Sequence, residues 1–260
     1  MQLRLCTPIF LCFTLAVFIY VLSLPRIPQD PTYHMFADRR SMLGMPNFLD
    51  VMSNMPFLVA GIWGLICTVP QRQRPAFREK HERWPYVLFS LGVTLTCFGS
   101  AYYHWSPDNS TLVWDRLPMA VSFMGIFAGT ISDRIGARAG RLFLAPLLVI
   151  GLLSVLYWYF SELKGAGDLR LYFVVQFFTI AAIFLLIILF PARYTHSGWL
   201  IAAGGAYVLA KVLEVLDKQV FYAVKISGHT LKHLIASLAA FCIVGMIMRR
   251  STAEAQSKDA

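Results

Sequence analysis

The sequence predicts an all-α polytopic membrane protein whose chain crosses the bilayer several times. Of its 260 residues, 57% are apolar and only 14% are charged, against roughly 25% charged in a typical soluble domain. The apolar residues gather in blocks of about 20, the length of a helix that crosses a hydrocarbon core of ~30 Å. Because backbone at that depth must satisfy its own hydrogen bonds, helices are the expected form.

Eight apolar blocks follow one another along the chain, joined by short connections. They cover residues 7–24, 48–69, 85–104, 112–131, 142–160, 171–190, 198–216 and 229–248. We therefore expect one transmembrane domain over 1–250 and a disordered cytoplasmic tail over 251–260. The first block could be a signal peptide, but its length and the poor cleavage site after it favour a retained helix.

The net charge of +9 does not indicate nucleic-acid binding, because the basic residues lie in short loops beside apolar blocks. The loops after the second, fourth and sixth blocks, together with the two ends of the chain, hold more Lys and Arg than the opposite loops. The strongest contribution comes from residues 71–84. By the positive-inside rule, both termini are expected in the cytoplasm.

Histidines stand at the ends of two apolar blocks. His229 and His233 enter the last block at a spacing of four, which places both rings on one helical face as a natural pair of metal ligands. Their alternative reading is two interfacial histidines beside a snorkelling Lys232. His104 ends the third block one turn after Ser100, and taken alone it reads as part of an aromatic belt.

Carboxylates and amides stand at the starts of two other blocks. Asp115 opens the fourth block, where a helix N-terminus favours negative charge, so capping is its simplest role. Asp50 and Asn54 share a face at the start of the second block, with Asn47 a turn earlier. These residues could cap helices and form hydrogen bonds between helices. A role in orienting the metal ligands through hydrogen bonds explains them equally well.

Topology gives a test of these readings. Alternating the eight blocks across the bilayer brings His104, Asp115, His229 and His233 to one membrane depth on the non-cytoplasmic side, with Asp50 beside them. An ionisable group in the bilayer costs roughly 2.5–3.5 kcal/mol on insertion scales and is usually paired or functional. The pattern favours a metal site at this depth, with His104, His229 and His233 as candidate ligands.

These motifs together resemble the alkaline ceramidase family of membrane hydrolases. The matching residues are Ser100 and His104 on one helix, Asp115 eleven residues after that histidine, and His229 and His233 on the last helix. The stretch 114–119, Trp-Asp-Arg-Leu-Pro-Met, is similar to the family's Asp-Glu-Leu-Pro-Met segment, and Ser53 and Asn54 also match. The resemblance covers residues 48–248, a seven-helix hydrolase core to which the first block adds one N-terminal helix.

The resemblance implies a zinc-dependent hydrolase of lipid metabolism that cleaves the amide bond of ceramide, releasing a sphingoid base and a fatty acid. The sequence resembles a bacterial member of the family. Such a protein would lie in the inner membrane with its active site near the periplasmic face. Arg116 stands where the family commonly has Glu. Family members also carry an acidic N-terminal calcium site. Here Asp38 and Asn47, with Asp30, are the only evident oxygen ligands between 30 and 47, fewer than the six to eight that calcium prefers.

In the expected mechanism, Asp115 is the general base and Ser100 donates a hydrogen bond to the developing oxyanion. The substrate is then ceramide or a related lipid amide drawn from the bilayer. The nearest alternative is a lipid hydrolase or receptor of the adiponectin-receptor type, with the same metal site. A metal or small-solute transporter is the alternative from another class, but it would place its site near the bilayer midplane in a repeated fold.

Overall fold

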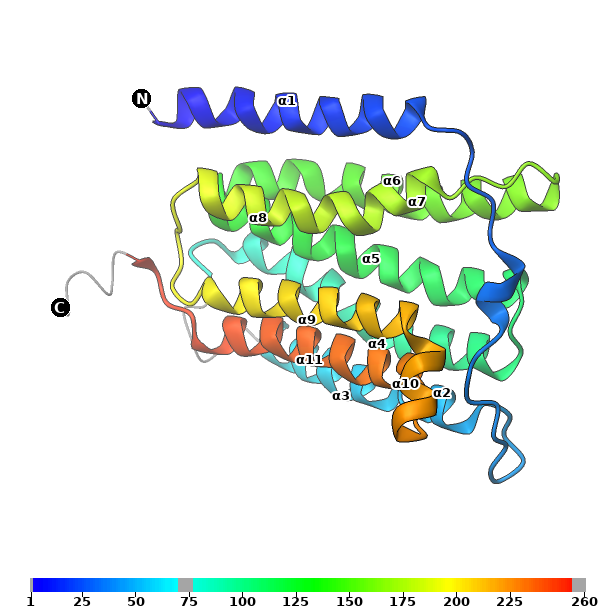
Figure 1. Cartoon of the computed structure of the whole chain (residues 1–260). Helices are drawn as coiled ribbons and strands as arrows, with labels where there is room; N and C mark the ends of the chain where they lie inside the picture. The colour runs from blue at the N-terminus through cyan, green and yellow to red at the C-terminus, as the bar shows by residue number, and fades with distance from the viewer. Residues whose placement is uncertain (1, 70–76, 254–260) are drawn as a thin grey trace.

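Long helices lying side by side make up the molecule (Figure 1). The computed structural model describes residues 2–69 and 77–253, which are predominantly helical and contain two isolated β-bridges but no strand. The chain is thus an all-α polytopic membrane protein, as the sequence predicts. The basic residues Arg72, Arg74 and Lys258 and most of the predicted tail, 254–260, lie outside the described residues.

Seven of the eight predicted blocks each correspond to one continuous helical segment, and the second corresponds to two helices separated by a short break. The long segments are α1 (Gln2–Ser23), α3 (Met55–Thr68), α4 (Trp84–Trp105), α5 (Asn109–Arg134), α6 (Ala137–Leu163), α7 (Arg170–Phe173) continuing through the π-helical turn η3 (Val174–Phe178) into α8 (Thr179–Leu189), α9 (Gly198–Val215) and α11 (Gly228–Arg249). The short ones are η1 (Pro31–His34), α2 (Phe48–Met52), η2 (Lys80–Arg83) and α10 (Asp217–Val224). The second block is therefore broken between α2 and α3, just before Pro56, and α10 was not predicted.

Seven helical segments of the described chain are long and apolar enough to cross a membrane. The long helix outside this set is α5, which is more polar because it carries Asp115, Arg116, Asp133 and Arg134. All four of these side chains are buried, and α5 packs against both α4 and α6. A helix enclosed by others tolerates such residues because its polar groups meet protein instead of lipid.

Apolar side chains cover the outside of the bundle. Leu15 of α1, Ile66 of α3 and Leu142 of α6 are each about two-thirds exposed, as expected for surfaces that face lipid tails. Helix α1 lies at the margin of the bundle (Figure 1). It contacts the π-helical turn through Phe13 and Phe18, whose ring centroids lie 5.9 and 6.0 Å from that of Phe178.

The N-terminal end of α1 and the C-terminal end of α11 lie at one end of the bundle, and residues 24–47 cross the opposite end from α1 to α2 (Figure 1). We call residues 24–47 the strap. The C-terminal end of α4 and the N-terminal ends of α5 and α11 meet beneath it. All the predicted site groups are therefore at the same end of the bundle, away from the termini, as the alternation of the blocks requires.

A second polar cluster closes the end of the bundle near the termini. Arg250, which is 5% exposed, donates to Asp133 Oδ2 at 2.8 Å and to the hydroxyl of Tyr86 at 3.2 Å. The backbone beyond it continues in order: the Thr195 N–H donates to the Ser251 carbonyl, and Thr252 forms a β-bridge with Tyr194. The predicted disorder therefore does not begin at residue 251.

Candidate metal centre

Three buried imidazole rings converge at the strap end of the bundle. His104 is at the last turn of α4, and His229 and His233 lie on the first turns of α11. Their ring centroids are 4.7 to 5.0 Å apart, and one ligand nitrogen from each lies within 4.8 Å of the others. The three predicted metal ligands are thus brought together from positions 125 residues apart in the chain.

The imidazole of His104 has the properties of a metal ligand, because it is buried and forms no hydrogen bond with the described residues. Its side chain is 0% exposed, and neither Nδ1 nor Nε2 has a hydrogen-bond partner among the described residues. A buried unpaired polar group costs roughly 1–3 kcal/mol, so a ring in this state is normally satisfied by something further. Three imidazoles at one point make a donor set compatible with zinc.

His233 is held from behind by the junction between α2 and α3. The hydroxyl oxygen of Ser53 lies 2.8 Å from His233 Nδ1. Ser53 in turn donates to the Asp50 carbonyl at 3.0 Å. A partner on the second ring nitrogen fixes the orientation and tautomer of a metal-binding histidine, so this contact presents Nε2 to the site.

Asp50 ties the start of α11 to α2. Its Oδ1 accepts hydrogen bonds from the hydroxyls of Ser227 at 2.7 Å and Thr230 at 2.5 Å, on either side of His229. Asn54 donates to the Asp50 carbonyl at 2.8 Å. The two residues expected behind the metal ligands are both there, Asp50 in direct support and Asn54 one step further away.

The strap covers the three histidines. Phe36 is 5% exposed, and its ring centroid is 4.6 Å from that of His104 and 4.9 Å from that of His229. Asp217 at the start of α10 clamps this arrangement: its Oδ2 accepts from the Ala37 N–H at 2.8 Å and its Oδ1 from the His229 N–H at 2.9 Å. The metal ligands are therefore shielded on the side away from the bilayer.

Asp115 and Ser100 form a pair beside the histidines. Both side chains are buried, at 6% and 2% exposed, and both line the same cavity. The α4 and α5 backbones approach closely here because position 99 is a glycine, where an added Cβ would stand 1.9 Å from the carbonyl oxygen of Trp114. Asp115, the residue expected to be the general base, thus lines the same cavity as Ser100 and His233.

The site also has ionisable neighbours on α9, Lys211 and Glu214, which were not predicted as site residues. Glu214 on α9 is ion-paired to Lys211 and, at 2.7 Å, to Lys232 of α11, and its Oε1 also accepts from the Tyr33 hydroxyl at 3.0 Å. Lys232 Nζ lies 3.0 Å from His229 Nε2. The sequence feature that could have identified them is the presence of Lys211 and Glu214, three residues apart, inside the apolar block 198–216. Ionisable residues in such a block are normally functional or paired.

Arg116 turns away from Asp115 and is not ion-paired within the described chain. Its Nη2 donates to Gln29 Oε1 at 2.7 Å, and its guanidinium lies 4.0 Å from the Trp158 ring centroid and 4.9 Å from that of Tyr172. Arg116, which stands where the resembled family commonly has Glu, therefore joins the strap, α5, α6 and α7.

The calcium expectation is not supported by the positions of its residues. Both oxygens of Asp38 are engaged by the Arg40 side chain, at 2.8 and 2.6 Å, and this hydrogen bonding lowers the pKa of the Asp38 carboxyl. Asn47 Nδ2 donates to the His104 carbonyl at 2.8 Å, which holds the end of α4 in place. These side chains support the metal centre's surroundings instead of forming an oxygen cage.

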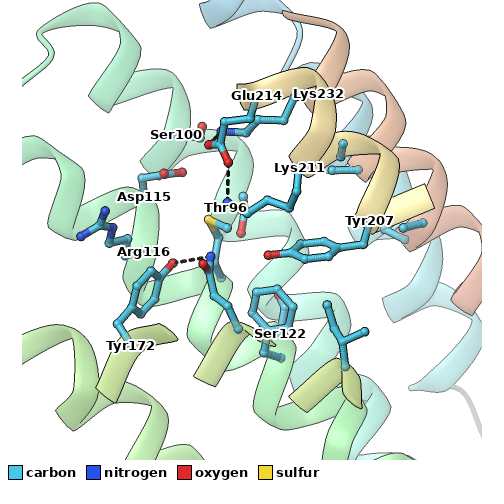
Figure 2. A pocket seen from close by; sticks show the side chains of 18 of the residues that line it. Thr96, Ser100, Asp115, Arg116, Ser122, Tyr172, Tyr207, Lys211, Glu214 and Lys232 are labelled. Atoms are coloured by element: carbon cyan, nitrogen blue, oxygen red, sulfur yellow. Dashed lines mark hydrogen bonds and ion pairs between the residues drawn. The ribbon is translucent and has the colours of Figure 1, made fainter. Parts of the chain in front are cut away.

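A cavity of about 390 Å³ opens from the site into the bundle. Ser100, Asp115 and His233 line one end of it, together with Glu214 and Lys232 (Figure 2). The far walls are apolar and come from α5, α8, α9 and α11, with the lining residues Ile126, Ile180, Ile183, Phe184, Leu200, Ala203, Ala239, Ala240 and Ile243. The cavity is therefore polar where the metal centre is and apolar where it reaches the middle of the bundle.

No protein-family model matches this chain, and no curated protein sequence matches it either.

Proposed function

We propose that this protein is a zinc-dependent membrane amidohydrolase of the ceramidase type. It would cleave the amide bond of ceramide or a related lipid amide into a fatty acid and a free amine. The observation that carries the proposal is that a histidine cluster, a carboxylate–hydroxyl pair and a largely apolar cavity lie together. A buried cluster of three histidines lies beside the Asp115–Ser100 pair, at the head of a cavity whose deeper walls are apolar.

Zinc is the metal that this donor set favours. Imidazole nitrogen suits zinc, and three neutral protein ligands with one open position are the pattern of catalytic zinc rather than structural zinc. His104, His229 and His233 would hold it. When bound, it would supply Lewis-acid activation of water and of the amide carbonyl.

The residues of the chain divide the proton transfers between them. Asp115 would take a proton from the attacking water as its oxygen bonds to the amide carbon. It would then return that proton to the amide nitrogen as the carbon–nitrogen bond breaks, so that one water yields one fatty acid and one amine. Ser100, which lines the same end of the cavity as Asp115, would donate a hydrogen bond to the developing oxyanion.

A lipid substrate suits the shape of the site. The strap covers the polar end through Phe36, whereas the cavity continues between apolar walls of α8 and α9. The scissile amide would then sit at the metal centre with a chain lying in the cavity. The excess of basic residues in the loops at the opposite end supports a cytoplasmic position for both termini and a site near the outer face of the membrane.

The test is direct hydrolysis by the purified, zinc-loaded protein in detergent micelles. N-acyl sphinganine is incubated with it, and released fatty acid and free base are measured together by mass spectrometry. Asp115→Asn should abolish turnover while zinc stays near one per chain, because Asp115 is not among the ligands. His104→Ala and His233→Ala should lose both zinc and turnover.

His196→Asn is the matched control, since His196 is exposed and lies outside the site at a positive φ of 65° that Asn tolerates. It should keep metal and activity. Full turnover in Asp115→Asn would remove Asp115 as the base. Zinc retained at one per chain in both histidine variants would contradict the metal assignment itself.

A further inference from the structure

Two polar side chains lie halfway along the cavity, where the proposed reaction makes no use of them. Tyr207 projects from α9 and Gln176 from the π-helical turn, and both line the cavity. Figure 2 shows the hydroxyls of Tyr172 and Tyr207 pointing toward the middle of the pocket from opposite sides. Polar groups at this depth need a partner, because an unpaired buried hydroxyl or amide costs roughly 1–3 kcal/mol.

The Tyr207 hydroxyl is buried and makes no hydrogen bond with any described residue. Its ring is fixed by an edge contact with Phe123, whose centroid is 5.3 Å away at an interplanar angle of 89°. The hydroxyl is thus held toward the cavity by packing. A phenylalanine would fill the same space without the cost of an unpaired hydroxyl, so the oxygen itself requires an explanation.

Gln176 is 4% exposed and only half satisfied. Its Nε2 donates to the Tyr172 hydroxyl at 3.0 Å, while its Oε1 accepts no hydrogen bond from the described part of the chain. It sits in the π-helical turn Val174–Phe178, and such turns frequently mark functional sites in helices. The pair therefore offers one free acceptor and one hydroxyl able to donate.

The position of this pair along the cavity is set by helix geometry. Tyr207 precedes Glu214 by seven residues on α9, which is about 10 Å along the axis. Leu200 lies another seven residues, again about 10 Å, toward the far end, where the lining is apolar. A ligand that satisfies Tyr207 and Gln176 thus carries its polar group well away from the metal centre and still has an apolar end beyond it.

We propose that the cavity recognises a lipid chain bearing a hydroxyl group near its middle, through Tyr207 and Gln176. The ligand hydroxyl would accept from Tyr207 Oη and donate to Gln176 Oε1, so both unpaired groups would be used. A keto group at the same place could only accept and would satisfy Tyr207 alone. This inference rests on the proposed function for placing the chain's carbonyl end at the metal centre, but chain recognition itself needs no hydrolysis.

The experiment measures chain binding and amide turnover separately. Binding of radiolabelled octadecanoate is competed with unlabelled octadecanoates bearing a hydroxyl at carbon 3, 10 or 12, using the full zinc-loaded chain. The mid-chain hydroxyls should bind about five- to tenfold more tightly than the unsubstituted chain, as one or two net hydrogen bonds provide. The 3-hydroxy chain should show no such gain.

Tyr207→Phe and Gln176→Leu should each remove this preference, whereas Tyr222→Phe, at an exposed position on α10, should retain it. Equal binding of all chains by the wild type, or a preference that survives in Tyr207→Phe, would overturn the inference.

The same chains are then offered as amides of sphinganine. Mid-chain preference in binding without hydrolysis of any amide would support the recognition site and refute the proposed function. Hydrolysis of the amides without any preference for mid-chain hydroxyls in binding would support the proposed function and refute the recognition site. Thermal unfolding of each variant shows whether it has kept the fold.

Discussion

The hydroxyl of Ser53 lies 2.8 Å from Nδ1 of His233, which connects the break between α2 and α3 to a candidate metal ligand on the last helix. The break in the second apolar block therefore supports one of the three clustered histidines. It turns a serine toward a ring whose other nitrogen faces the site. Contacts of this kind tune a metal site without touching the ion.

Ser53→Ala should weaken zinc binding by roughly 10- to 100-fold, because the His233 ring loses the partner that orients it. The measurement is competition with a chelator of known zinc affinity. Ser154→Ala is the matched control: Ser154 is 3% exposed on α6 and donates only to the Gly151 carbonyl at 2.7 Å. Equal zinc affinity in the Ser53 variant and the wild type would show that the contact is incidental.

Gly99→Ala should separate α4 from α5 and disrupt the site. An added Cβ would stand 1.9 Å from the Trp114 carbonyl oxygen, and backbone cannot move aside there without shifting Ser100 and His104 relative to Asp115. Lower thermal stability and lower zinc occupancy are expected together. Gly205→Ala, where a Cβ meets nothing within 4 Å, should be neutral or stabilise α9 by up to about 1 kcal/mol. Matching behaviour of the two variants would contradict the close approach.

Asp133→Ala should destabilise the fold by roughly 3–5 kcal/mol while leaving zinc binding unchanged. It removes the carboxylate that Arg250 contacts at 2.8 Å, and Arg250 is almost completely buried at the end of the bundle away from the metal centre. Thermal unfolding and metal content measured on one sample separate the two effects. Glu79→Ala removes the exposed pairing with His81 and should change stability by less than about 1 kcal/mol. Zinc loss in Asp133→Ala before unfolding would show that the two ends are coupled.

Acidification should release the strap. The imidazole of His34 lies between the Tyr103 hydroxyl at 3.0 Å and Asn109 Oδ1 at 3.1 Å, and burial lowers its pKa below the ordinary value of 6.5. The undocked strap therefore binds more protons than the docked one below about pH 6.5, so docking is favoured at neutral pH and weakens as the pH falls.

Hydrogen exchange of strap amides at about pH 7.5 and about pH 5.5, corrected for intrinsic rates, measures this effect. His34→Gln, which cannot gain a proton, should give equal protection at both values. A wild-type strap equally protected at both would show that His34 titration does not govern docking.

The order and length of the helices follow from the sequence alone, because each apolar block is long enough by itself to form a membrane-spanning helix. A run of about 20 apolar residues has few alternatives to a membrane helix, so all eight segments were predicted within a few residues. Alternation of those segments also determines which ends meet, and this brought His104, Asp115 and the α11 histidines to one end. The i, i+4 spacing of His229 and His233 needed no tertiary information.

The partners of the site residues were decided only by the packing of the helices. Ser53 meets His233 across 180 residues, Tyr33 meets Glu214 across 181, and Phe36 covers two histidines from a strap without helical periodicity. The cavity and its unpaired Tyr207 hydroxyl likewise depend on how α5, α8, α9 and α11 approach one another. Local sequence carries no record of such contacts, because each depends on distances between segments that only the folded bundle sets.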